Sequence, residues 1–222
     1  AQLADLAPWP KAPAIGPQER AARIARAREL MGQIGAEALI IGAGPSLRYF
    51  TGVAWNATER LVALALPLTG PLKMICPRFE LGSLQAALLV EAELLLWEEH
   101  ESPYSLTTQA LADLGARSLA IDPALPFFVF NGLRLAAPDL ALLDGAPVVD
   151  GCRSIKSPAE LALMSQAKAM TLEVHRRAAR ILAPGVTTAE VRRFIDQAHR
   201  ALGADDGSSF CAVQFGVASA YP

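Results

Sequence analysis

The chain has 222 residues, of which 52% are hydrophobic and 19% charged, and its formal net charge at pH 7 is −2. This length fits one large domain, or one complete domain and part of a second. The composition is that of a globular protein rather than a disordered one. Because the charges nearly balance, there is no electrostatic reason to expect nucleic acid or an anionic membrane as a partner, and neither is predicted.

The cysteines and the first residues of the chain indicate in which cellular compartment the protein is found. Cys76, Cys152 and Cys211 are odd in number and lack C-x-x-C spacing, so neither a disulfide framework nor a thiolate zinc site is indicated. The opening AQLADLAPWPKAP contains no basic n-region and no apolar h-region, and no apolar run approaches the length of about 18 residues that a membrane span needs. The sequence therefore predicts a soluble, cytoplasmic protein.

Short apolar segments alternate with helical ones through the first two thirds of the chain. The stretch 17–35 places Ile24, Ala27 and Met31 on one helix face and closes at Gly35. Strands are predicted at 37–44, 60–68, 72–77, 91–97 and 117–123, and helices at 102–115 and 127–137. Interleaved strands and helices indicate an α/β fold.

The pattern changes between residues 148 and 160. A long helical periodicity replaces the α/β alternation, so a domain boundary is predicted near Gly151, with an N-terminal domain over 1–150 and a second domain over 151–222. Capping boxes at 157–160 and 187–190 predict the starts of two helices. The apolar run 208–222, SSFCAVQFGVASAYP, follows them and is predicted to be a strand at the edge of a binding site.

No stretch contains a complete active site by residue chemistry alone. Gly42-Ala43-Gly44 suggests a phosphate-binding turn, but Leu47 stands where the third glycine is needed, so an ordinary strand-to-helix turn is predicted. A cysteine nucleophile at Cys211 with His199 and Asp205 or Asp206 can be drawn, although a buried cysteine and a turn at Asp205-Asp206-Gly207 are commoner. His100, His175 and His199 are too far apart in sequence to form a local ligand set, and His175 and His199 are predicted to be surface residues on solvated helix faces. No catalytic residue or metal ligand is assigned.

Four stretches, taken in order, resemble one family. They are SLRYFTG at 46–52, RSIKSPAELALMSQA at 153–167, PGVTTAEV at 184–191 and SSFCAVQFGVASAYP at 208–222. Together they resemble the Xaa-Pro dipeptidases (prolidases), aminopeptidases P and creatinase. The resemblance implies a creatinase-like N-terminal domain with a mixed, mostly parallel sheet flanked by helices. The first two helices and first strand of a pita-bread catalytic domain are expected to follow.

The resemblance also implies an activity. The peptidases of this family hydrolyse the bond before proline in short peptides, using two bridged divalent metals, commonly manganese, held by two Asp, one His and two Glu. In the family pattern all of these ligands lie beyond residue 222. The chain is therefore expected to hold no cofactor and to be inactive alone, as the N-terminal portion of a homodimeric metallopeptidase in which the N-terminal domain supports dimerisation and covers the active site.

The same resemblance suggests residues near the substrate. Tyr49, Phe50 and Trp55 are candidate aromatic lid groups, and Phe215 and Tyr221 are candidate substrate contacts. Core packing is the alternative interpretation for each of them.

Two other readings of the chain stay open. A pita-bread relative that has lost its metals would be a protein-binding module, and a creatinase-like enzyme would hydrolyse a C–N bond without metal. In any of these cases an isolated strand and an apolar helix face within 154–222 are expected to pack on a partner chain or on another copy.

Overall fold

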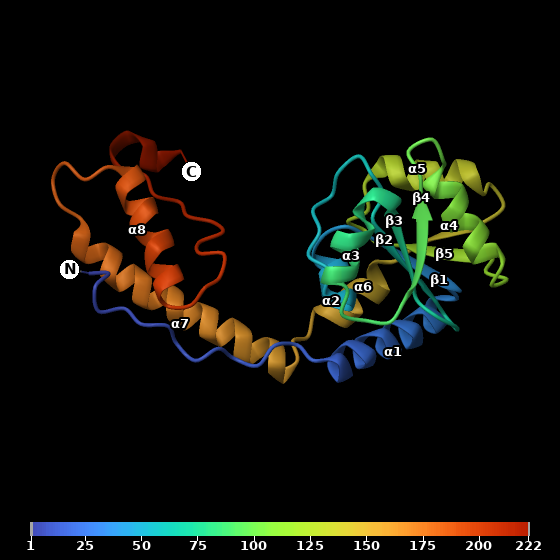
Figure 1. Ribbon diagram of the computed structural model, residues 1–222, viewed down its shortest axis with the longest axis horizontal. Coiled ribbons are helices and arrows are strands. Elements are labelled where there is room, and N and C mark those ends of the chain that lie inside the picture. The colour runs from blue at the N-terminus through green and yellow to red at the C-terminus, as the bar shows by residue number, and fades with distance from the viewer. Residues whose placement is uncertain (1, 222) are drawn as a thin grey trace. The chain divides into compact units, whose positions relative to one another are not determined.

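The structure, a computed structural model, describes residues 2–221 and divides them into two compact units (Figure 1). Residues 15–155 form the α/β unit, and residues 2–14 with 156–221 form the helical unit. The division follows Ile155, because a helix continues through Gly151, where the sequence pattern had placed the boundary. Each unit is described by itself below.

The α/β unit contains six strands and six α-helices within residues 15–155. In chain order the elements are α1 (Pro17–Ile34), β1 (Ala38–Gly42), α2 (Pro45–Thr51), β2 (Ala63–Pro67), β3 (Lys73–Pro77), the 3₁₀ turn η1 (Arg78–Glu80), α3 (Leu81–Ala87), β4 (Glu93–Trp97), α4 (Pro103–Ala112), β5 (Ser118–Ile121), α5 (Phe127–Ala136), β6 (Ala141–Asp144) and α6 (Ala146–Arg153). Every strand and helix predicted in this region is present, and α2 follows the predicted strand-to-helix turn at 42–44; α3, β6 and α6 were not predicted from the sequence.

The six strands form one sheet in the order β4-β3-β2-β1-β5-β6. The pairs β1–β2 and β2–β3 are antiparallel, whereas β1–β5, β3–β4 and β5–β6 are parallel. In the centre of the sheet, Ile40 of β1 is paired with Ala65 on one side and with Ile121 on the other. The sheet is therefore mixed and mostly parallel, as the resemblance implied.

Helices cover both faces of this sheet (Figure 1). Leu39 and Ile41 of β1 pack in a core with α1, α2, α3 and α6, whereas Ala38 and Ile40 pack in a second core with α4 and α5. All residues of β1, β2 and β3 are buried, because successive side chains point to opposite faces that are both covered. This burial explains why β1, β2 and residues 74–77 of β3 are continuous apolar runs; Lys73, at the start of β3, is buried and pairs with Glu93.

The helical unit consists of α7 (Pro158–Ile181), α8 (Thr188–Ala201) and the 3₁₀ turn η2 (Gly216–Ala220), together with the start of the chain. Val174 and Phe194 lie in its core, and Leu6 and Trp9 pack against that core. The Trp9 N–H donates a hydrogen bond of 2.9 Å to the carbonyl of Leu202. Residues 2–14 therefore pack with α7 and α8. Over residues 2–221, no helix is both long and apolar enough to cross a membrane.

Both predicted capping boxes are formed. The Glu160 N–H donates to Ser157 Oγ (3.2 Å) and the Ser157 N–H donates to the Glu160 carboxylate (2.8 Å). Thr187 and Glu190 make the same reciprocal pair at 3.2 and 2.8 Å. Each box satisfies N–H groups that the first turn of a helix leaves without an intrahelical acceptor.

We expect Thr187→Ala to lower the free energy of unfolding of the helical unit by about 1 kcal/mol, because the N-cap acceptor is lost. The measurement is urea denaturation followed by circular dichroism. Thr188→Ala, one residue further along the same helix, is the matched control and should change the value by less than about 0.5 kcal/mol. Equal losses in both variants would contradict a capping role for Thr187.

The predicted strand at 208–222 is not formed in the part that the structure describes. Residues 208–215 are irregular and η2 follows them. A strand needs a neighbouring strand to accept its backbone hydrogen bonds, and the described residues of the helical unit provide none. The segment starts instead from a fixed turn, in which the Arg200 guanidinium donates to the carbonyls of Asp205 (3.0 Å) and Asp206 (3.1 Å).

Candidate functional site

The family-like stretch 46–52 forms helix α2, directly after β1. Gly44 has φ 136° and allows the sharp turn out of the strand, so the ordinary strand-to-helix turn predicted here is confirmed. Side-chain hydrogen bonds join this helix to the end of α6. Arg153 donates to Ser46 Oγ (3.0 Å), and the Tyr49 hydroxyl donates to the Cys152 carbonyl (2.8 Å). Two family-like stretches about 100 residues apart in the sequence therefore contact each other at this point.

Arg23 of α1 completes this junction, and the sequence analysis missed it. Its guanidinium carbon lies 3.9 Å from the centroid of the Tyr49 ring, and it donates to the Tyr49 carbonyl (2.8 Å) and to Glu19 (2.6 Å). The Arg23 side chain is only 8% exposed. Its position four residues before Ala27, on the buried face of α1, was the signal in the sequence.

The structure separates the three candidate lid residues. Phe50 is fully buried and packs edge-to-face against Tyr49, with ring centroids 4.9 Å apart, so for Phe50 core packing is the correct interpretation. Tyr49 is half-buried and uses its hydroxyl to hold α6. Trp55 is half-buried on the irregular segment 53–62 and packs partly against the same core. A lid role stays a prediction, and Trp55 is the residue whose position suits it best.

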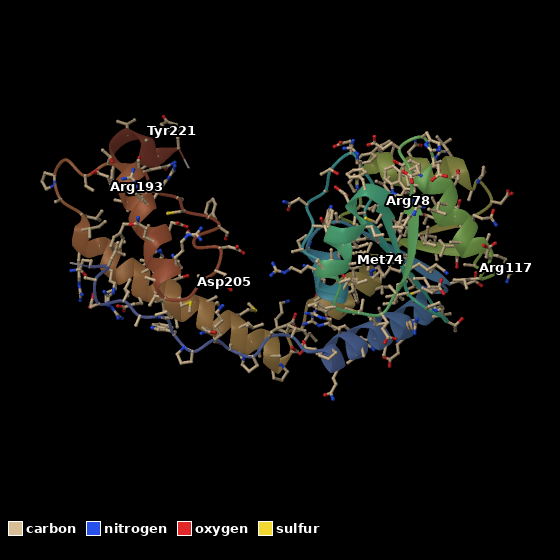
Figure 2. All side chains as sticks on the ribbon, viewed as in Figure 1. Met74, Arg78, Arg117, Arg193, Asp205 and Tyr221 are labelled. Carbon is tan, nitrogen blue, oxygen red and sulfur yellow. The ribbon has the colours of Figure 1, made fainter. Side chains whose placement is uncertain are left out.

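Phe215 and Tyr221 lie in the segment that follows α8. Phe215 is 42% exposed and Tyr221, labelled in Figure 2, is 75% exposed. The Gln214 side chain donates to the Tyr221 carbonyl (3.0 Å) and fixes the backbone of η2. Both rings therefore present surface that a ligand could contact, and their role in substrate binding stays a prediction.

The possible cysteine-nucleophile triad is not assembled. Asp205 pairs with Lys11 (2.7 Å), and His199 is half-buried, with Nδ1 2.8 Å from the Ile195 carbonyl and Nε2 3.4 Å from Thr171 Oγ1. Within residues 2–221 no hydrogen bond joins Cys211 to His199 or Asp205. His199 therefore packs between α7 and α8 instead of lying on a solvated face; His175 is exposed, as predicted.

Possible metal ligands are dispersed. Among the residues that the structure describes, no three His, Cys, Asp or Glu side chains come together in a way that could hold a metal ion. The residues present therefore do not fit a two-metal centre, and no step of a reaction is assigned to a metal on this chain.

The stability of the α/β unit depends on pH through the buried thiol of Cys76. Burial raises the pKa of its thiol from 9.0 to about 11, and the nearby Glu80 carboxylate adds to the increase. Because the folded state keeps this proton to higher pH than the unfolded state, its contribution to stability is complete below pH 9 and is lost as the pH rises from 9 to about 11.

Replacing Cys76 tests this dependence. We expect the free energy of unfolding of Cys76→Ala to fall less steeply between pH 9 and 11 than that of the unchanged chain. Denaturant titrations at a series of pH values measure the slopes. Parallel curves for the Cys76 variant and the unchanged chain would show that another group causes the alkaline loss.

Comparison with known proteins agrees with this architecture. The model of the "Creatinase/Prolidase N-terminal domain" matches residues 23–155, which is more than half of the chain. The chain belongs to the creatinase/prolidase family. The matched region ends at Ile155, the last residue of the α/β unit.

Individual proteins of this family are similar to the chain over more residues than the 23–155 that the family model matches. The "Probable dipeptidase PepE" of Mycobacterium bovis is 30% identical over 182 residues, which are 80% of this chain and 48% of the relative. The solved dipeptidase PepE of Mycobacterium ulcerans has a TM-score of 0.71 at 31% identity, covering 81% of this chain and 48% of that one. A solved prolidase from Thermococcus sibiricus shares the fold, with a TM-score of 0.71 at 24% identity and coverage of 86% and 51%. The chain thus spans about half the length of each of these three relatives.

Proposed function

We propose that this chain is the N-terminal portion of an Xaa-Pro dipeptidase-type metallopeptidase, a hydrolase that cleaves the bond before proline in short peptides. One observation carries the proposal: the alignment with a dipeptidase covers 182 residues, so it extends beyond the N-terminal domain at 23–155 and into the helical unit. The likeness to a solved prolidase supports the prolyl specificity. A metal-free hydrolase and a non-catalytic binding module are the second candidates.

The chemistry of the substrate explains why such a protein needs metals. A peptide bond before proline is a tertiary amide without an N–H, so proteases that grip an extended main chain through that group are poorly matched to it. Two divalent metals, manganese in this proposal, supply a bridging water of lowered pKa and polarise the carbonyl. Because the described residues do not fit such a centre, we propose that its ligands lie in further residues of the native protein, outside residues 1–222.

The role proposed for the portion present is dimerisation and covering of the active site. Large apolar side chains exposed on the helical unit support it, because association with a partner would remove this apolar surface from water. Those more than half exposed are Leu161 (51%), Leu172 (65%), Leu182 (51%), Phe210 (87%) and Val217 (84%). Additional residues of the native protein, or a second copy of it, would bury these side chains. Light scattering of the native protein should give the mass of a dimer. A monodisperse monomer would contradict the dimer.

Hydrolysis by the native polypeptide tests the proposed function. An antibody against the α/β unit captures the protein from its source cells, and the captured protein is assayed on Ala-Pro and on Ala-Ala. We expect manganese-dependent hydrolysis of Ala-Pro, loss of that activity with a chelator, and much slower hydrolysis of Ala-Ala. Hydrolysis of creatine instead of Ala-Pro would favour the metal-free enzyme, and no hydrolysis of either by the metal-loaded protein would favour the binding module; both results would reject the proposal.

A further inference from the structure

A cavity of about 400 Å³ opens in the α/β unit where strands β5 and β6 end. Two aspartates, Asp122 and Asp144, line it together with apolar side chains, and no lysine or arginine is among its lining residues. Ligand sites of α/β proteins are commonly found at the carboxyl ends of parallel strands. This volume lies within the range of small-molecule pockets, roughly 300–1,000 Å³. The place and size of the cavity therefore suit a small ligand.

Strand pairing brings the two carboxylates to the same edge of the sheet. Ile121 of β5 is paired with Asp144 of β6, and Asp122 follows Ile121 directly. Each aspartate uses Oδ1 to accept a local backbone N–H, from Ala124 (3.0 Å) and from Ala146 (2.8 Å). Within the described part of the chain, neither carboxylate forms an ion pair and neither Oδ2 accepts a hydrogen bond. Asp122 is only 2% exposed.

Asp122 is buried and Asp144 is exposed, and neither carboxylate has a cationic partner among the described residues, so a cation held in the cavity could pair with both of them. Aromatic rings stand beside the carboxylates: Phe127 and Phe130 line the same cavity, with ring centroids 6.1 Å apart. The Phe127 side chain is 76% exposed, so its ring is accessible to a ligand in the cavity. Ring faces attract cations within about 6 Å. The carboxylates and the aromatic rings therefore both favour a cationic ligand.

We propose that this cavity binds a small organic cation, an ammonium or guanidinium group on an apolar stem. The cationic group pairs with Asp122 and Asp144, and the stem lies against Leu125, Leu142 and Phe127. A divalent metal ion is a poorer match, because it needs about six oxygen ligands and the cavity walls are mostly apolar. The site lies wholly within the α/β unit and does not depend on the hydrolytic activity proposed above.

Binding of phenethylamine to the 222-residue chain tests the proposal. We expect the backbone amide resonances of residues 122–125 and 144–146 to shift in a saturable way when phenethylammonium is added. The uncharged analogue 2-phenylethanol should bind at least about tenfold more weakly, since a charge-assisted hydrogen bond is worth roughly 1.4 kcal/mol or more. Equal binding of the two compounds would overturn the proposal.

Matched variants separate charge from packing. Asp122→Asn keeps the acceptor for the Ala124 N–H and should weaken phenethylammonium binding about tenfold. Phe127→Ala removes an exposed ring, without opening the core, and should weaken it several-fold. The controls Asp139→Asn and Phe79→Ala, both exposed and outside the cavity, should leave it unchanged.

Three further results would overturn the proposal. Calcium chloride that shifts the same resonances and displaces phenethylammonium would identify a metal site. The same shifts produced by concentrating the protein without ligand would identify a surface that binds a second copy. Unchanged binding in both the Asp122 and Phe127 variants would show that the amine binds elsewhere.

Discussion

The 222-residue chain by itself is expected to hydrolyse no Ala-Pro, with or without excess manganese. Hydrolysis of this kind requires a metal-activated water and a polarised carbonyl, and these require several carboxylate and imidazole ligands around two ions. No three such side chains come together in residues 2–221. Because enzymes accelerate their reactions by at least about 10⁶-fold, the loss of the centre should leave only the rate of the uncatalysed reaction.

The assay for this prediction follows the release of free proline, with the dipeptidase PepE of Mycobacterium ulcerans, of which this chain covers 48%, measured in parallel. Calorimetric titration of manganese into the chain should show no tight, stoichiometric binding. Turnover of Ala-Pro above the buffer rate, or a stoichiometric manganese site, would contradict the proposed division between this portion and the rest of the enzyme.

Phe50→Ala is expected to lower the free energy of unfolding of the α/β unit by about 3–5 kcal/mol, because it empties a fully buried site. Phe50 has no exposed surface and packs against the Tyr49 ring, which itself connects α1, α2 and α6. The cavity left by the truncation is therefore bordered by side chains that are already held by hydrogen bonds, and it collapses poorly.

Hydrogen exchange of the Ile40 and Leu64 amides measures this loss within the α/β unit alone. Phe79→Ala is the matched control: its ring is 63% exposed, so its removal should change the free energy of opening by no more than about 0.5 kcal/mol. If Phe50→Ala behaved like Phe79→Ala, then Phe50 would not be a core residue, and its candidacy as a lid group would return.

The elements that could be predicted are those determined by residues close together in the sequence. Strands buried on both faces, such as residues 39–41, have to be apolar throughout, and glycines mark their ends. The helix starts at 157 and 187 carry two reciprocal hydrogen bonds within four residues, so the sequence alone reveals them. The four family-like stretches allowed the mixed sheet to be expected before its strands were paired.

The parts that were missed depend on contacts distant in sequence. The edge strand β6 has only four residues, with exposed ends, and resembles a loop. Residues 2–14 have no periodicity and are ordered by contacts such as Lys11 with Asp205, 194 residues away. The strand expected at 208–222 has the right composition, but it needs a partner strand that the described residues do not supply.

The candidate site residues could likewise be predicted only in part from the sequence. Aromatic residues at 49, 50 and 55 could be found from the sequence, but exposure decides which of them can face a ligand, and exposure depends on the whole fold. Tyr49 owes its fixed position to Arg23 and to the Cys152 carbonyl, neither of which is near it in sequence. The Asp122–Asp144 pair likewise arises only when β5 and β6 align.

The mass of the native polypeptide tests most directly whether these 222 residues belong to a larger hydrolase. The aligned 182 residues are 48% of the Mycobacterium bovis relative, so that relative has about 380 residues, or about 40 kDa at the mass per residue of this chain. An antibody against the α/β unit should capture a polypeptide of about that mass from the source cells. A native polypeptide of 23.5 kDa, the mass of the 222 residues themselves, would contradict the proposal.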